Sequence, residues 1–134
     1  MHPRLLLDTH VVVRWLIEPR KLSREQVRAL YEAERRVLPV AASAMSLLEI
    51  AVLASEGRLP SRTSADAVFE RLRASPVFTV LPMTFEIASE VAALGPALRD
   101  PMDRAIVATA RVHNLRLVTS DQRIIESNLV TVLE

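Results

Sequence analysis

The chain has 134 residues, of which 50% are hydrophobic, a formal net charge of +1 and no cysteine. This length predicts a single domain over residues 1–134, and the apolar content excludes a largely disordered chain. The lack of cysteine excludes disulfides, thiolate metal sites and cysteine nucleophiles. The small net charge neither predicts nor excludes a nucleic-acid partner.

Nothing in the sequence suggests export or membrane insertion. The apolar run Leu5–Leu7 ends at Asp8 and is too short for a signal peptide. No apolar segment approaches the ~20 residues that a bilayer-spanning helix needs. We therefore expect a soluble, cytoplasmic protein with no membrane partner.

Short apolar runs of strand length alternate with longer segments of helical periodicity. Strands are predicted over Arg4–Leu7, Val37–Ala41, Val77–Leu81, Leu115–Val118 and Leu129–Leu133. Helices are predicted over His10–Ile17, Ser23–Arg36, Ser43–Glu56, Thr63–Ala74, Thr84–Leu94, Pro101–His113 and Gln122–Ser127. This alternation is typical of β–α units, so the fold class is α/β with a mainly parallel sheet.

Four acidic residues fall at the predicted edge of the sheet instead of on solvated helix faces. Asp8 directly follows the first strand, and Asp121 lies just past the end of the fourth. Glu49 and Asp103 each lie in the first turn or two of an apolar helix that begins at the same edge. In an open parallel sheet, ligands bind beyond the carboxyl ends of the strands.

Bringing four carboxylates together costs several kcal/mol unless cations neutralise them. Mg²⁺ or Mn²⁺ suits such a site, because both are hard cations that prefer oxygen ligands. One or two such ions would acidify a water and offset the charge that develops on a phosphodiester under attack. The pattern therefore indicates metal-dependent phosphodiester hydrolysis.

Each of these acidic positions also has a purely structural alternative. Asp8 and Asp121 can be N-caps of the helices that follow them. Ser46 and Glu49 have the spacing of a capping box. Asp100 precedes a proline at the start of a helix, which favours capping over catalysis. Capping does not explain why four carboxylates share one predicted edge.

Other polar residues near this edge are weaker candidates. Four hydroxyl side chains are placed to bind water or phosphate, although a cap or turn role fits each equally well: Thr9, Ser46, Thr119 and Ser120. The histidines lack metal-ligand spacing and are left outside the predicted site: His2, His10 and His113. Trp15 and Met45 occupy apolar helical positions and are interpreted as core.

Four segments resemble the motifs of PIN domains, especially the VapC-type toxins of VapBC toxin–antitoxin pairs. They are Leu5–Val11, Ser43–Ala51 with Glu56–Leu59 after it, Asp100–Ala110, and Leu117–Asp121. They cover about a third of the chain and occur in the family's order. Each motif alone is weak, but four in order are strong. Met102 occupies a position where the family often has phenylalanine, an apolar change of similar volume.

The resemblance implies an α/β/α fold and Mg²⁺- or Mn²⁺-dependent endoribonuclease activity. It implies that Asp8, Glu49, Asp103 and Asp121 form the catalytic, metal-binding quartet. Asp100 is an auxiliary acidic residue, and the sequence leaves open whether Asp100 or Asp103 points inward. A homodimer and a cognate antitoxin protein are the implied partners, with RNA as the substrate.

Three other functions fit the sequence less well. A receiver-type phosphoacceptor domain needs a lysine on a late strand, but Lys21, the only lysine, lies early in a predicted loop. A PIN-like domain that binds RNA or protein without cutting does not explain the intact quartet. A DNA nuclease of the flap type needs additional helices for which 134 residues leave little room.

The N-terminal helices contain more apolar side chains than one helix face is expected to bury. We predict that this surface receives an amphipathic helix of the antitoxin, which could also bring an arginine to the carboxylates. The alternative is that these residues pack internally or at a homodimer interface. They are Val12, Val13, Leu16 and Ile17 on the first helix, and Val27, Leu30 and Tyr31 on the next.

Overall fold

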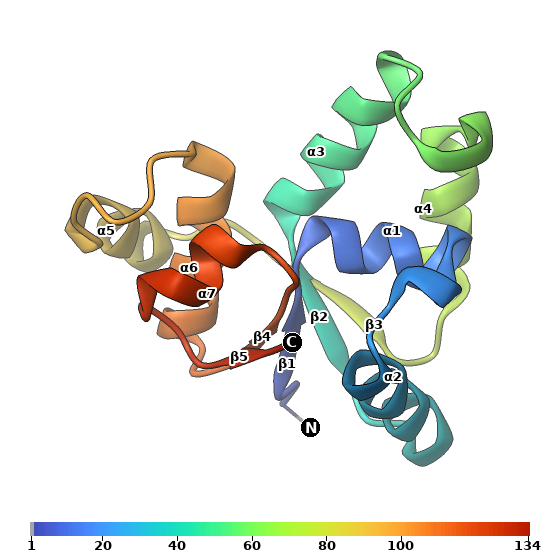
Figure 1. Cartoon of the computed structure of the whole chain (residues 1–134), viewed down its shortest axis with the longest axis horizontal. Coiled ribbons are helices and arrows are strands. Elements are labelled where there is room, and N and C mark those ends of the chain that lie inside the picture. The colour runs from blue at the N-terminus through green and yellow to red at the C-terminus, as the bar shows by residue number, and fades with distance from the viewer. Residues whose placement is uncertain (1) are drawn as a thin grey trace.

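The structure is a computed structural model that describes residues 2–134. At its centre is a five-stranded sheet of order β3-β2-β1-β4-β5, in which every neighbouring pair is parallel (Figure 1). The strands are β1 (Leu5–Leu7), β2 (Val40–Ser43), β3 (Phe78–Leu81), β4 (Arg116–Val118) and β5 (Val132–Leu133). The predicted α/β class is therefore confirmed, and all five predicted strands form.

Helices cover both faces of the sheet. They are α1 (Thr9–Ile17), α2 (Arg24–Arg36), α3 (Ala44–Ser55), α4 (Ala65–Ala74), α5 (Phe85–Ala93), α6 (Pro101–Val112) and α7 (Gln122–Ser127), with short 3₁₀ turns η1 (Pro19–Lys21) and η2 (Pro60–Arg62). Figure 1 shows α1 to α4 on one side of the sheet and α5 to α7 on the other. This is the three-layer α/β/α arrangement. No helix within residues 2–134 combines the length and the apolar character needed to cross a membrane.

Two separate cores explain why the strands are apolar on both faces. Successive strand residues point to opposite faces, so Leu6 packs with the α5–α7 core and Leu7 with the α1–α4 core. Leu117 and Val118 on β4 divide in the same way. A continuous apolar run such as Leu5–Leu7 therefore encodes a strand buried on both sides.

Some predicted boundaries move because cap geometry overrides the apolar pattern. The second strand begins at Val40 instead of Val37, because Val37 ends α2 in a left-handed conformation with φ of 52°. The strand instead continues to Ser43, which pairs with Leu81 on β3. The last strand begins at Val132, three residues later than predicted.

The predicted surplus of exposed apolar residues on the N-terminal helices is partly wrong. Val12, Val13 and Leu30 are 0%, 7% and 2% exposed, because they pack in the core between the sheet and helices α1 to α4. Val27 and Tyr31 on α2 remain 46% and 63% exposed. A groove of about 560 Å³ lies beside these two residues, between α1, α2 and the end of α4, and Trp15 and Leu16 also line it. We call it the α1–α2 groove.

The strand order fixes where a site forms. The chain runs from β1 through α1 and α2 to β2 on one side, and later returns through α6 to β4 on the other side of β1. The loops that follow β1 and β4 therefore separate at the carboxyl edge of the sheet. A crevice is expected at such a topological switch point.

Candidate active site

The crevice is a cavity of about 330 Å³ at the carboxyl edge of the sheet. Asp8, Glu49, Asp103 and Asp121 all line it, and they arrive from β1, α3, α6 and the loop after β4. Asp100 also lines it. The structure therefore places every acidic residue of the predicted site around one cavity.

Asp8 is the most rigidly held of these carboxylates. It is 4% exposed, and its Oδ1 accepts a hydrogen bond of 2.8 Å from the backbone N–H of Thr9. Its Oδ2 accepts one of 2.7 Å from the hydroxyl of Thr119, which is itself buried. The two donors, one adjacent to Asp8 and one 111 positions away from it, thus fix the carboxylate plane while leaving lone pairs free.

Glu49 lies in the second turn of α3 and is half-buried. The capping-box alternative for Ser46 and Glu49 is wrong, because Ser43 is the N-cap and accepts a 3.0 Å hydrogen bond from the N–H of Met45. Ser46 is inside the helix, fully buried, and its hydroxyl lies 2.9 Å from that of Thr9. This contact ties α3 to the segment that carries Asp8.

Asp100 is the N-cap of α6, as the proline after it predicted. Its Oδ1 accepts hydrogen bonds from the N–H groups of Met102, at 2.8 Å, and Asp103, at 3.1 Å. Asp100 is exposed, whereas the side chain of Asp103 is only 14% exposed. Asp103 is therefore the more enclosed of the two carboxylates.

Asp103 carries the clearest sign of crowding in the cavity. Its pKa is raised from the ordinary 3.8 to about 6, first by burial and then by the negative charges of Asp100, Asp8 and Asp121. The cation of Arg123, whose Nη2 lies 3.3 Å from Asp103 Oδ2, lowers it in part. A bound cation would relieve this repulsion.

Arg123 is a site residue that the sequence analysis missed. Its Nη2 donates to Asp121 Oδ2 at 2.9 Å and its Nε to Oδ1 at 3.2 Å, so the guanidinium binds the carboxylate with both arms. Since the same Nη2 approaches Asp103, the guanidinium bridges the two acids. This pairing holds the pKa of Asp121 below its usual value. The available signal was its position two residues after Asp121, in the first turn of α7.

His10 also lines the cavity, although its spacing had placed it outside the predicted site. Its Nε2 accepts a 2.9 Å hydrogen bond from the N–H of Ser120, so Nδ1 carries the proton, 3.5 Å from Asp8 Oδ2. Burial lowers the pKa of His10, which favours this neutral form. The hydroxyl of Ser120 accepts from Gln26 of α2 at 3.0 Å, and Gln26 is fully buried. His10 and Gln26 thus hold the loop between β4 and Asp121.

The candidate ligands of this cavity suit Mg²⁺ or Mn²⁺, because each of them is a carboxylate and offers oxygen atoms to the cation. Within residues 2–134, however, no three acidic or histidine side chains come close enough together to form a ready metal site. Arg123 holds two of the carboxylates and Thr119 holds a third. Asp8, Glu49, Asp103 and Asp121 are the residues that would hold such an ion in this cavity.

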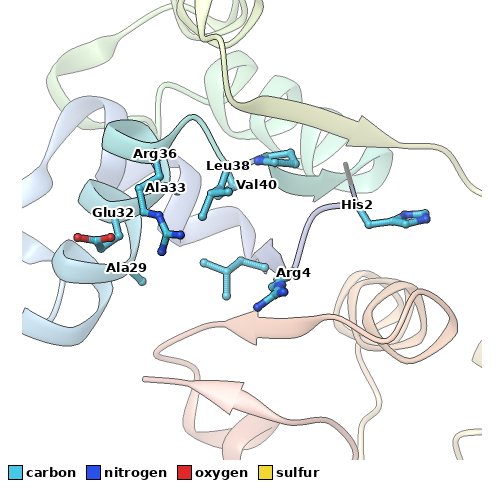
Figure 2. A pocket seen from close by; sticks show the side chains of 10 residues that line it. His2, Arg4, Ala29, Glu32, Ala33, Arg36, Leu38 and Val40 are labelled. Carbon is cyan, nitrogen blue, oxygen red and sulfur yellow. The ribbon is translucent and has the colours of Figure 1, made fainter.

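A larger cavity, of about 540 Å³, lies at the opposite, amino edge of the sheet (Figure 2). Its floor is apolar and includes Ala33 and Val40, and its rim includes Arg4 and Arg36. Glu32 is the one carboxylate among its lining residues, which belong to the described range 2–134. This cavity has no acidic cluster, so the chemistry is assigned to the smaller one.

Comparisons with known proteins agree with this geometry. A family model for the PIN domain matches residues 5–127. The chain is 36% identical over 121 residues to the protein named Ribonuclease VapC22 of Mycobacterium tuberculosis, covering 90% of this chain and 88% of that protein.

Solved structures share the fold. The structure of VapBC2 from Rickettsia felis, bound to a promoter DNA fragment, superimposes with a TM-score of 0.73 at 13% identity, over 96% of each chain. FitAcB from Neisseria gonorrhoeae gives 0.71 at 23% identity, over 97% of this chain and 96% of that chain. The family match, the curated relative and the arrangement of the sheet lead to one assignment: the chain belongs to the PIN domain family.

Proposed function

We propose that this protein is an endoribonuclease that hydrolyses RNA phosphodiester bonds with Mg²⁺ or Mn²⁺, and that it is the toxin of a type II toxin–antitoxin pair. The observation that carries the proposal is the convergence of Asp8, Glu49, Asp103 and Asp121 on one cavity. The named activity of the relative at 36% identity supports the substrate class. A PIN-like domain that binds without cutting would have no need of four carboxylates in one cavity.

Hydrolysis of a phosphodiester requires an activated water and compensation for charge that develops on the phosphate. A divalent ion held by the quartet would supply both, as a Lewis acid. The chain itself supplies orientation. Thr119 and the N–H of Thr9 hold Asp8 in one position, and Arg123 holds Asp103 and Asp121 beside each other through its two ion pairs.

The hydroxyl residues of the predicted site act as positioning residues in this proposal. Thr9, Ser46 and Thr119 are buried, and each hydroxyl already binds another side chain of the site. Ser120 is exposed, but its hydroxyl and its N–H are held by Gln26 and His10. Removing one of these contacts is therefore expected to disturb the carboxylates, in the manner of outer-shell groups around a metal.

The first prediction tests metal dependence. Purified protein should cleave single-stranded or loop RNA in Mg²⁺ or Mn²⁺, stop completely in EDTA, and recover when excess Mn²⁺ is returned. Glu49→Gln protein purified in parallel is the control, because a contaminating ribonuclease would persist in it. Cleavage that continues undiminished in EDTA would contradict the metal-dependent mechanism.

The α1–α2 groove is the proposed docking surface for the antitoxin. Val27 and Tyr31 expose apolar area beside it, and an amphipathic helix binds such a groove through residues spaced three and four apart. Solved structures with the same fold include a toxin–antitoxin complex from Klebsiella pneumoniae and VapBC from Salmonella typhimurium. An arginine from that partner, in addition, would bind the carboxylates in the way that Arg123 does.

The second prediction concerns this surface. Expression of the chain alone should arrest growth, and co-expression of the cognate small protein should restore it. Tyr31→Glu should abolish the rescue without reducing RNA cleavage, because a buried charge in the groove opposes binding. Val37→Glu is the matched control, since Val37 is 61% exposed at the end of the same helix but does not line the groove. Rescue that survives Tyr31→Glu would place the antitoxin elsewhere.

The third prediction concerns self-association through a second apolar surface, on α3 and the edge strand β3. Leu48 and Val80 line one cavity there and are 49% and 37% exposed. We propose that a second copy of the chain covers this surface, because exposed apolar area of this kind marks interfaces. Sedimentation should give a dimer that Leu48→Glu weakens. A wild-type monomer at micromolar concentration would contradict the proposal.

A further inference from the structure

The cavity that holds the carboxylates also has basic lining residues. Arg14 comes from α1, Lys21 ends η1, and Arg58 lies in the turn between α3 and η2. We call these three residues the basic wall. Figure 1 shows α1 and α3 on one side of the carboxyl edge, and α6 and α7 on the other. The basic wall therefore lies on the α1 and α3 side of the cavity, opposite Asp100, Asp103 and Asp121.

Arg14 lines the cavity without an ion-pair partner among the described residues. It lies four residues after His10 on α1, which places both side chains on the face of the helix that meets the cavity. Within residues 2–134, none of the ion pairs engages Arg14. Arg14 is half-buried, and without a carboxylate partner its guanidinium is free to bind an anion.

Lys21 and Arg58 have only weak partners. Lys21 pairs with Glu18 at 3.2 Å, and Arg58 with Glu56 at 3.2 Å, and both cations are more than half exposed. Exposed ion pairs of this kind contribute ~0–1 kcal/mol. A phosphate can therefore replace the carboxylate on either cation at little cost. Arg123 differs, because it is engaged by two carboxylates.

We propose that the basic wall binds the phosphate backbone of single-stranded RNA next to the bond that is cut. This inference rests on the proposed ribonuclease function and adds the path of the substrate. A cavity lined by six aspartate and glutamate residues around one phosphate repels the rest of a polyanion. Cations from three separate segments offset that repulsion on the neighbouring phosphates. Because such contacts are made to backbone phosphates, they position the RNA strand without recognising its bases.

The first experiment measures the number of phosphate contacts. Binding of a short single-stranded RNA to Glu49→Gln protein in Mn²⁺ is followed over a series of salt concentrations. Arg14→Gln, Lys21→Gln and Arg58→Gln, each added separately, should weaken binding several-fold and reduce the slope of log K against log salt by about 0.7. Arg28→Gln is the control, because Arg28 has the same i,i+3 ion pair as Lys21 but lies on α2, outside this cavity.

The second experiment uses the single lysine of the chain. Acetylation of primary amines can modify only Lys21 and the α-amino group, and mass spectrometry separates the two products. Saturating RNA should slow acetylation of Lys21 several-fold and leave the α-amino group unchanged. This readout needs no substitution in the wall, so it does not depend on the folding of a variant.

The outcomes separate the two proposals. If the Glu49→Gln protein binds RNA, but the salt slope and the acetylation of Lys21 do not change, the basic wall is overturned and the ribonuclease proposal stands. If neither RNA binding by this protein nor cleavage by the wild type is found, both are overturned. A smaller slope of log K against log salt in the three wall variants, together with slower acetylation of Lys21 in RNA, supports phosphate binding by the basic wall.

Discussion

Asp8→Asn is expected to reduce RNA cleavage by at least ~100-fold while leaving the fold intact. Asparagine keeps the shape of aspartate but loses the charge that binds a cation. Replacing residues that only orient metal ligands already costs ~10–100-fold, so loss of a direct ligand should exceed this. Initial rates in Mn²⁺ and a thermal melt, measured on the same preparation, test the prediction. Glu49→Gln and Asp121→Asn should behave alike.

Two further variants make this result specific. Asp66→Asn, in the exposed first turn of α4, removes an aspartate of the same kind outside the cavity and should keep full activity. Thr119→Val should reduce activity ~10–100-fold, because it removes the donor that orients Asp8 Oδ2, and Thr119→Ser should restore it. Full cleavage by Asp8→Asn would mean that Asp8 is only the N-cap of α1.

Asp103→Asn is expected to lose activity as Asp8→Asn does, and at the same time to stabilise the metal-free protein. The pKa of Asp103 is raised to about 6, so the folded protein binds a proton more tightly there than the unfolded chain does. Stability contributed by this group therefore falls as pH rises from about 4 to 6. Above pH 6 the variant should be more stable than the wild type by up to ~3 kcal/mol, because one pKa unit corresponds to ~1.4 kcal/mol.

Denaturation in urea at pH 4 and pH 8, without metal, measures this difference. The free energy of unfolding of Asp103→Asn should exceed that of the wild type at pH 8, and the two should differ little at pH 4. Asp100→Asn is the matched control, since asparagine can still cap α6 and Asp100 is exposed. It should change cleavage by less than ~10-fold. If Asp100→Asn is the more damaging substitution, the inner position has been assigned to the wrong aspartate.

Much of this fold is encoded locally. The apolar run Leu5–Leu7 alone specifies a strand buried on both faces, and the alternation of such runs with amphipathic segments specifies a parallel α/β sheet. Because parallel strands end at a common edge, the acidic residues that follow them, Asp8 and Asp121, were predictable as neighbours. The capping role of Asp100 was equally local, since it needs only the residues that directly follow it.

Other features depended on contacts that no local pattern contains. The residues that hold Asp8 and Ser120 in place, Thr119 and Gln26, lie 111 and 94 positions away from their partners. Arg123 is close to Asp121 in sequence, but only the folding of the chain brings its guanidinium to Asp103 as well.

By itself, the sequence determined which segments form strands and helices and which acidic residues face one edge, because periodicity and strand direction are local properties. The tertiary structure alone decided which side chains are buried in the two hydrophobic cores. Val12 and Val13 are buried because α1 packs against α3 and α4, and no property of α1 alone encodes that. It also decided which cations meet the carboxylates, because a charge contact depends on distance in space and not along the chain.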